Sequence, residues 1–257
     1  MRITYRDKDN KSYWTKRWID IDADEPMKNE NKYPLKFSKL IIKSKKKLIL
    51  EAGCGAGRIL RYYHNNNYKI IGIDFVKEAV DKLKKKDNLL DVRVGNITKL
   101  DFKNNYFDYI LAFGLYHNLN ETLNDAITET SRVLKKNGFI CASFRADNIQ
   151  NRITDYMKSK KMKNKKEFHK MNLTKKEFVD LFRKKNFLIK NIYPVENMPF
   201  LYRFRFFREK NQKKFNENQA RRDGYQFSFF GKIIQYFLIK FFPDQFCNIY
   251  VLIAKKM

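Results

Sequence analysis

A chain of 257 residues with 43% hydrophobic and 16% aromatic residues can bury a substantial core, which excludes a disordered or low-complexity protein. Its formal net charge of +27 favours an anionic partner, and the excess is concentrated in residues 151–257, with 26 Lys and Arg against nine Asp and Glu. The three cysteines are widely spaced and form no C-x-x-C pair, which argues against a zinc site or a disulfide framework, so we expect no metal.

The first 46 residues are polar with aromatic anchors, and we expect them to form an N-terminal helical lead-in or lid. Residues 1–10 contain no signal-peptide core. The most apolar run, residues 227–242, contains Gly231, Lys232, Gln235 and Lys240 and is not a membrane span. We therefore expect a cytoplasmic protein, with peripheral contact to the inner membrane surface left open.

From residue 47 onward, short apolar runs alternate with amphipathic stretches. The runs predict strands over residues 47–51, 68–74, 91–94, 107–113 and 138–144, and the stretches predict helices over 58–65, 76–86 and 120–135. Buried strands that alternate with helices of this length indicate a parallel sheet with helices on both faces.

The second half of the chain is less regular. A basic stretch over residues 146–172 precedes Thr174 and Glu177, whose spacing is that of a capping box opening a helix over 175–185. Strands are expected at 187–193 and 247–254, separated by an aromatic and basic insertion, about residues 199–243. No linker separates two domains.

A glycine-rich turn follows the first expected strand. Gly53, Gly55 and Gly57 allow a tight turn and close approach of a ligand to the main chain, a feature that nicotinamide and flavin enzymes share. Three details distinguish this turn. Arg58 replaces the third glycine of a dinucleotide fingerprint, Glu51 precedes the first glycine by two positions, and Asp74 ends the second strand, where a carboxylate can accept hydrogen bonds from both ribose hydroxyls.

From about Leu48 to Phe144 the chain resembles the class I S-adenosylmethionine-dependent methyltransferases of the small-molecule type. The resemblance implies an α/β fold with a seven-stranded, doubly wound, mostly parallel sheet and an antiparallel last strand. It implies a methyltransferase domain over residues 47–257, with acceptor-side elements at about 146–173 and 199–243. It also implies S-adenosyl-L-methionine as cofactor, bound by Glu51, Gly53, Cys54, Gly55, Gly57, Asp74, Phe75, Asn96, Ile97 and Phe113.

In that family the acid at position 51 orients the methionine ammonium, the acid at 74 binds the ribose, and the residue at 75 packs on adenine. Asp is the commonest residue where this chain has Asn96, which can still accept a hydrogen bond from the adenine amino group. The alternative for Asp74 is that it only caps the helix after it.

The loop after the fourth strand, residues 113–118, is where the family brings methyl donor and acceptor together. His117 is the candidate general base, because an ordinary imidazole titrates near neutrality, and Tyr116 is a candidate for orienting the acceptor. The alternative is that His117 caps a helix or shapes the pocket. Trp14 and Trp18 would fold over the cofactor or acceptor, or else anchor a helix.

The acceptor is the least determined part of the function. The N/D-P-P-Y/F signature of base-amine methyltransferases and the Pro-Cys nucleophile of cytosine-C5 enzymes are both missing, which disfavours nucleic acid. The insertion at 199–243 can be a cover on the sheet, an acceptor pocket or a membrane contact. We expect methyl transfer to oxygen or nitrogen of a small or lipid-linked metabolite. The alternatives are an RNA methyltransferase and a non-catalytic nucleotide-cofactor-binding protein.

Overall fold

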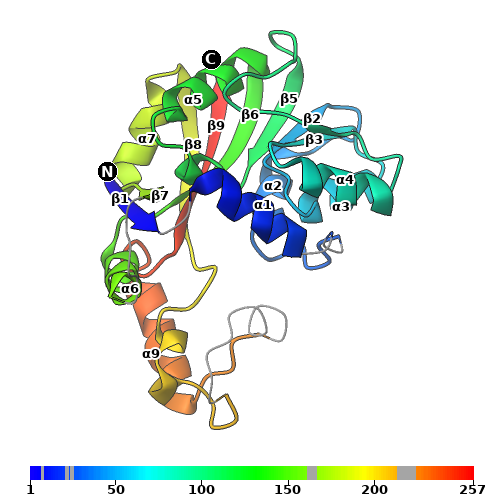
Figure 1. The fold of residues 1–257 in the computed structure, drawn as a ribbon. Coiled ribbons are helices and arrows are strands. Elements are labelled where there is room, and N and C mark those ends of the chain that lie inside the picture. The colour runs from blue at the N-terminus through cyan, green and yellow to red at the C-terminus, as the bar shows by residue number, and fades with distance from the viewer. Residues whose placement is uncertain (7–8, 21–22, 24–25, 161–166, 213–223) are drawn as a thin grey trace.

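The computed structural model describes residues 1–6, 9–20, 23, 26–160, 167–212 and 224–257. Its main body is a seven-stranded sheet in the order β4-β3-β2-β5-β6-β9-β8 (Figure 1). The strands are β2 (Ile49–Ala52), β3 (Ile70–Asp74), β4 (Val92–Val94), β5 (Phe107–Ala112), β6 (Leu134–Arg145), β8 (Phe187–Val195) and β9 (Ile249–Lys256).

Strand directions agree with the predicted topology. Strands β4, β3, β2, β5 and β6 pair in parallel, and β9 pairs antiparallel with both β6 and β8. All residues of β2 and β3 are buried, as expected for strands covered by helices on both faces. The predicted α/β sheet, seven-stranded and mostly parallel with an antiparallel last strand, is confirmed.

Helices cover both faces of this sheet. On one face, α2 (Leu35–Ile41), α3 (Arg58–Asn65) and α4 (Lys77–Lys86) share a core with the strands; on the other, α5 (Leu123–Val133) and α7 (Lys175–Arg183) do so. The predicted capping box at the start of α7 is present: Thr174 accepts a hydrogen bond from the Glu177 amide, and Glu177 accepts one from the Thr174 amide.

The N-terminal segment contains a strand that the sequence did not predict. After β1 (Arg2–Arg6) comes α1 (Asn10–Asp20), and β1 pairs antiparallel with β7 (Glu167–Asn172) to form a second, two-stranded sheet. The stretch at 146–172, for which no regular element was predicted, contains α6 (Ile149–Ser159) and β7, and its residues 161–166 lie outside the described part.

The segment between β8 and β9 projects from the same edge of the sheet that α1 faces (Figure 1). It contains two 3-10 turns, Leu201–Arg203 and Arg205–Phe207, and α9 (Phe229–Phe241), and it has a small apolar core of its own. We call the described residues 196–212 and 224–246 the lobe. Residues 213–223 of the predicted insertion lie outside the described part.

Candidate functional site

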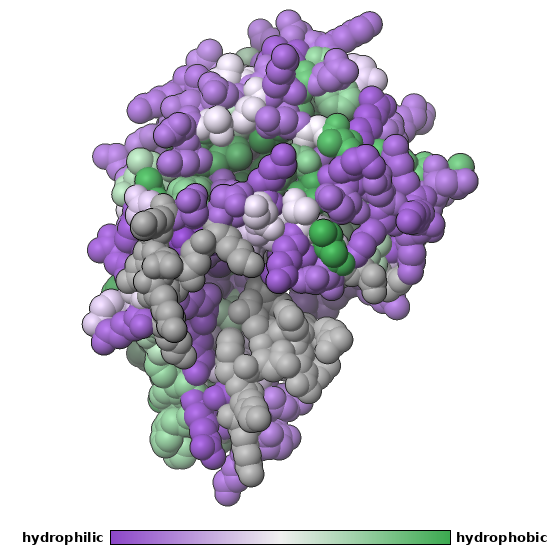
Figure 2. All heavy atoms as spheres, in the orientation of Figure 1, coloured by the Kyte–Doolittle hydropathy of each residue, from purple (hydrophilic) through white to green (hydrophobic). Residues whose placement is uncertain are grey.

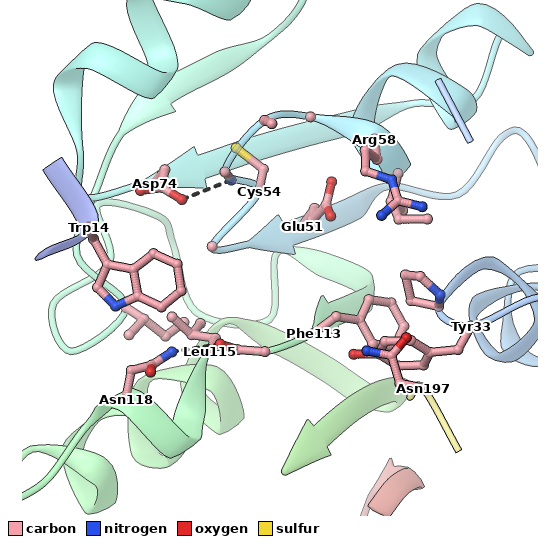
Figure 3. Close-up of a pocket in the computed structure, with 18 of the residues that line it drawn as sticks. Trp14, Tyr33, Glu51, Cys54, Arg58, Asp74, Phe113, Leu115, Asn118 and Asn197 are labelled. Atoms are coloured by element: carbon pink, nitrogen blue, oxygen red, sulfur yellow. Dashed lines mark hydrogen bonds between the residues drawn. The ribbon is translucent and has the colours of Figure 1, made fainter. Parts of the chain in front are cut away.

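A cavity of about 1440 Å³ opens at the carboxyl ends of β2, β3 and β5 (Figure 3). This is the edge of an open α/β sheet where ligands ordinarily bind. Every residue predicted to bind the cofactor lines this cavity, namely Glu51, Gly53, Cys54, Gly55, Gly57, Asp74, Phe75, Asn96, Ile97 and Phe113. The volume exceeds the usual range for a pocket that holds one small ligand, so it leaves room for a second.

The glycine turn forms the floor of the cavity through backbone conformations that other residues rarely adopt. Gly53, Gly55 and Gly57 have φ values of 72°, 50° and 78°, in the left-handed region. The amides of Gly53 and Cys54 both donate to the carbonyl of Ile73, at 2.8 and 3.0 Å, which ties the turn to the end of β3.

Asp74 connects the turn to the helix that follows β3. Its Oδ2 accepts a hydrogen bond from the Gly55 amide at 2.8 Å, and its Oδ1 accepts one from the Val76 amide at 3.0 Å, just before α4. Val76 is itself the N-cap residue of α4, and this helix has no side-chain cap hydrogen bond, so Asp74 does not cap α4 in the usual way. Each carboxylate oxygen keeps lone-pair capacity on the cavity side, so Asp74 can also receive hydroxyl donors.

Glu51 carries the least satisfied carboxyl group of the site. Its Oε2 is buried and has no hydrogen-bond partner among the described residues. Burial raises the pKa of Glu51 to about 8, with the Asp74 charge adding to the shift, although a backbone hydrogen bond from Leu60 and the Arg58 charge act in the opposite direction. A buried carboxyl oxygen without a partner, lining a cavity, is suited to a cationic ligand group.

Two tryptophans of α1 line the cavity beside the glycine turn. Trp14 and Trp18 line it and are stacked, with ring centroids 5.9 Å apart at an interplanar angle of 24°. Trp18 lies directly on the turn, because a Cβ added at Gly55 would come within 2.6 Å of its Cζ2. Figure 3 shows the Trp14 side chain facing the strand ends that carry Asp74.

We expect Gly55→Ala to weaken ligand binding by disturbing the Trp18 contact and the turn together. An alanine in the left-handed region costs about 1–2 kcal/mol by itself, and its methyl group would displace the Trp18 ring. Thermal unfolding and ligand titration of the variant measure the two effects. The matched control is Gly224→Ala, at a glycine that also has positive φ but whose added Cβ meets no heavy atom of the described residues within 4 Å. Equal loss of binding in both variants would contradict the assigned contact.

The predicted catalytic role of Tyr116 conflicts with its position in the structure. Tyr116 belongs to the 3-10 turn Tyr116–Asn118, is fully buried, and its hydroxyl lies 2.7 Å from Thr130 Oγ1 while its ring packs edge-on against Phe182. It does not line the cavity. Its apolar ring completes the core under α5 and α7, which explains its orientation.

His117 is not among the described residues that line the cavity, although its Cε1 lies 3.9 Å from the place of a Cβ added at Gly114, which does line it. Its ring packs edge-on against Phe144, and its Nδ1 is buried without a hydrogen-bond partner among the described residues. Burial lowers the pKa of His117 well below its usual value, and the positive charges of Arg145 and Lys170 lower it further. This placement and the weakened basicity argue against His117 as the general base.

A different acid, which the sequence did not single out, lines the cavity on the lobe side. Glu196 follows β8 directly, and its Oε1 accepts a hydrogen bond from Gln235 Nε2 of α9 at 3.0 Å. Burial raises the pKa of Glu196 to about 7, although the Gln235 hydrogen bond acts in the opposite direction. The one signal in the sequence that could have pointed to Glu196 was its position at the carboxyl end of a strand. Its burial depends on the lobe, which no local pattern predicts.

The lining residues divide into two ends. Figure 3 shows Asp74 and Trp14 at one end, Glu51 between the ends, and Tyr33, Phe113 and Asn197 together at the other. Tyr33 packs edge-on against Phe113 with ring centroids 5.6 Å apart. Glu196, adjacent in sequence to Asn197, also lines the cavity.

Comparison with known proteins finds similarity to methyltransferases over part of the chain. Residues 50–142 match the family described as "Methyltransferase domain". The protein MJ1252 of Methanocaldococcus jannaschii is 33% identical over 153 residues, which are 57% of this chain and 58% of that protein. The methyltransferase C1B3.06c of Schizosaccharomyces pombe is 31% identical over 124 residues, 42% of each chain. The chain thus spans about half the length of these relatives.

Solved structures share the whole fold at low sequence identity. A Haloferax volcanii methyltransferase, solved in complex with the Trm112 methyltransferase activator, has a TM-score of 0.62 at 11% identity, covering 95% of this chain and 94% of that one. A Methanosarcina mazei SAM-dependent methyltransferase has a TM-score of 0.58 at 17% identity, covering 88% of this chain and 98% of that one. These likenesses concern the fold.

Proposed function

Because the chain carries a class I, Rossmann-like methyltransferase domain, we propose that it binds S-adenosyl-L-methionine in the cavity at the strand ends and methylates an oxygen or nitrogen of a small or lipid-linked metabolite. The observation that supports this most is the buried, unpartnered Oε2 of Glu51 beside the glycine turn, in the same cavity as Asp74. Once ionised, the Glu51 carboxyl matches a ligand that carries an ammonium group, while Asp74 matches one that carries a ribose.

The residues of the cavity fit the proposed cofactor part by part. Asp74 would accept hydrogen bonds from the ribose hydroxyls, and Phe75, which is 43% exposed, offers a ring face to adenine. Asn96 Oδ1 already accepts the Thr98 amide at 3.0 Å and has a second lone pair for the adenine amino group. The stacked Trp14 and Trp18 would cover this end and exclude water.

When bound, S-adenosylmethionine supplies a methyl group on a sulfonium, which needs no further activation. The protein must chiefly hold an acceptor in line and exclude water, and it must remove a proton if the acceptor is a hydroxyl or a protonated amine. We assign that proton to Glu196, because this carboxyl lines the cavity beside α9 and its pKa of about 7 suits a base working near neutrality. The proton would pass from the acceptor oxygen or nitrogen to a carboxylate oxygen of Glu196.

We favour a small or lipid-linked acceptor over RNA because the chain lacks the N/D-P-P-Y/F and Pro-Cys signatures of nucleic-acid methyltransferases. The cavity lining combines the cations Lys32, Lys36 and Arg58 with neutral residues such as Phe113 and Pro199, so it suits either a phosphate-bearing or an apolar acceptor. Steep salt dependence of RNA affinity would favour the RNA alternative, and turnover of a small acceptor that salt leaves unchanged would reject it.

Calorimetric titration with S-adenosylhomocysteine and with NAD tests the cofactor assignment. We expect saturable binding of S-adenosylhomocysteine and none of NAD, because Arg58 occupies the position of the third glycine that a pyrophosphate turn needs. Binding of NAD alone would contradict the proposal. Binding of S-adenosylhomocysteine without transfer to any acceptor in a metabolite extract would favour the non-catalytic alternative.

We expect Asp74→Ala to weaken S-adenosylhomocysteine binding about tenfold or more, since a hydrogen bond to a charged group contributes about 1.5–3 kcal/mol. The variant also frees the amides of Gly55 and Val76, so its unfolding temperature should fall. Asp74→Asn separates the effects, because an amide oxygen can still accept one backbone hydrogen bond without the charge. Unchanged binding in both variants would remove Asp74 from the ribose site.

A further inference from the structure

The most exposed apolar surface of the described chain lies on α9, in the lobe. Its large side chains face outward. Those at least 39% exposed are Phe229, Phe230, Ile233, Ile234, Tyr236, Phe237 and Phe241, and Phe206 of the neighbouring 3-10 turn is 78% exposed. Scattered single apolar residues are ordinary on protein surfaces, but a contiguous group of this size marks an interaction site. In Figure 2 the lobe shows as a green area at the lower left of the molecule.

Helix α9 is amphipathic, but its apolar side faces away from the rest of the lobe. Gly231 and Gln235 are its buried residues, and Gln235 is held by Glu196 and by the Leu201 amide. Phe230, Ile233, Ile234, Phe237 and Phe241 are spaced by three, four, seven and eleven residues, which places them in one stripe. That stripe is turned away from the lobe instead of into it, so α9 is not the cover on the sheet that the sequence left open.

Two lysines of α9 lie outside this stripe. Lys232 and Lys240 are exposed and lie on one edge of α9, with Tyr236 midway between them at the four-residue spacing that puts all three in line. The Lys240 ammonium lies 5.4 Å from the centre of the Tyr236 ring and 5.6 Å from that of Phe241. Residues 224–242 contain no Asp or Glu.

We propose that α9 docks the protein in the interface of an anionic lipid membrane, with its phenylalanine and isoleucine stripe among the acyl chains and its lysines among the headgroups. Aromatic and aliphatic residues beside lysines are the composition of helices that lie in such an interface. With 13 residues, α9 is about 20 Å long, less than the hydrocarbon thickness of a bilayer. Consistently, no helix among the described residues is long and apolar enough to span a membrane.

Charge favours this partner over a second copy of the chain. Two lobes placed face to face would bring the same lysines together within molecules of net charge +27, with no acid on the helix to compensate. An anionic bilayer complements both the apolar stripe and the lysines. The lobe also joins the membrane surface to the cavity, because Glu196, Asn197 and Tyr225 line the cavity from its base.

Flotation with lipid vesicles tests the docking without depending on methyl transfer. We expect the full chain to float with vesicles of equal parts phosphatidylglycerol and phosphatidylcholine and to bind phosphatidylcholine vesicles at least about tenfold more weakly. In Phe230→Ser/Phe237→Ser, each lost aromatic should weaken binding about tenfold. In Lys232→Glu/Lys240→Glu, each reversal should weaken binding to the anionic vesicles about fivefold or more.

Matched controls use equally exposed residues far from the lobe. Leu89 is 79% exposed after α4, and Lys84 and Lys85 are exposed in its last turn, so Leu89→Ser and Lys84→Glu/Lys85→Glu change the same chemistry elsewhere. Their flotation should equal that of the parent, and unfolding temperatures confirm that every variant folds. Flotation that the lobe variants leave unchanged would overturn the proposal. The proposal would also be overturned if the parent chain does not bind vesicles and instead forms a dimer that Phe230→Ser/Phe237→Ser dissociates. Binding of the parent chain to an acidic protein alone would overturn it as well.

Discussion

Glu51→Gln should weaken S-adenosylhomocysteine binding about tenfold to a hundredfold at neutral pH, because the ligand ammonium loses its charged acceptor. A pKa of about 8 means that the free Glu51 carboxyl is mostly protonated at pH 7. Binding a cation favours the ionised form, so the parent protein should release about one proton per ligand bound. Calorimetry in buffers of different ionisation enthalpy measures this release, which Glu51→Gln should abolish.

The same carboxyl makes a prediction about stability in the absence of ligand. Its folded-state pKa lies above the unfolded value, so the folded state binds the proton more tightly, and this contribution to stability is lost as pH rises from about 4.5 to about 8. Glu51→Gln should therefore unfold at an equal or higher temperature than the parent near pH 8. If Glu51→Gln binds the ligand and releases a proton as the parent does, Glu51 is not part of the ligand site.

Glu196→Gln should lower kcat about a hundredfold or more, the usual range for loss of a general base, with little change in cofactor affinity. In the parent, kcat/KM should fall as pH drops below about 7, because the carboxyl must be ionised to accept a proton. The glutamine variant should lack this dependence, and Glu196→Asp should retain part of the activity. Turnover over a pH series with the identified acceptor gives both readouts.

Glu209→Gln is the control for this variant, since Glu209 is an exposed acid of the lobe that does not line the cavity. It should keep the parent's turnover and pH profile. An acceptor that is already a neutral nucleophile needs no base, so its turnover would not respond to Glu196→Gln. Full activity of Glu196→Gln on a hydroxyl acceptor is the result that excludes this carboxyl as the base.

The parts of the fold that depend on local pattern could be predicted from the sequence. Helix α3 begins and ends where the sequence predicted, and β2 and β3 differ from the predicted strands by at most two residues at either end. Buried apolar strands bounded by glycine turns and polar helices carry a strong local signal. The pairing of β1 with β7 was missed because Arg2 and Asn172 are far apart in sequence and neither strand has a marked apolar alternation.

The candidate site likewise has one part that the sequence predicts and another part that it does not. The cofactor residues follow strand ends, and parallel topology alone brings their positions to one edge of the sheet. The positions of Tyr116 and His117 depend on a 3-10 turn, in which a one-residue difference turns a side chain from the cavity to the core. Glu196 depends on burial by the lobe and on a hydrogen bond from Gln235, 39 residues away, which no spacing rule predicts.

A crystal structure of the chain with S-adenosylhomocysteine tests the central assignment most directly. We predict the ribose hydroxyls on Asp74, the amino group at Glu51 Oε2, and the thioether sulfur on the side of the cavity that Phe113 and Glu196 line. A ligand bound elsewhere, or bound in this cavity with its ribose away from Asp74 and its amino group away from Glu51, would contradict the assignment.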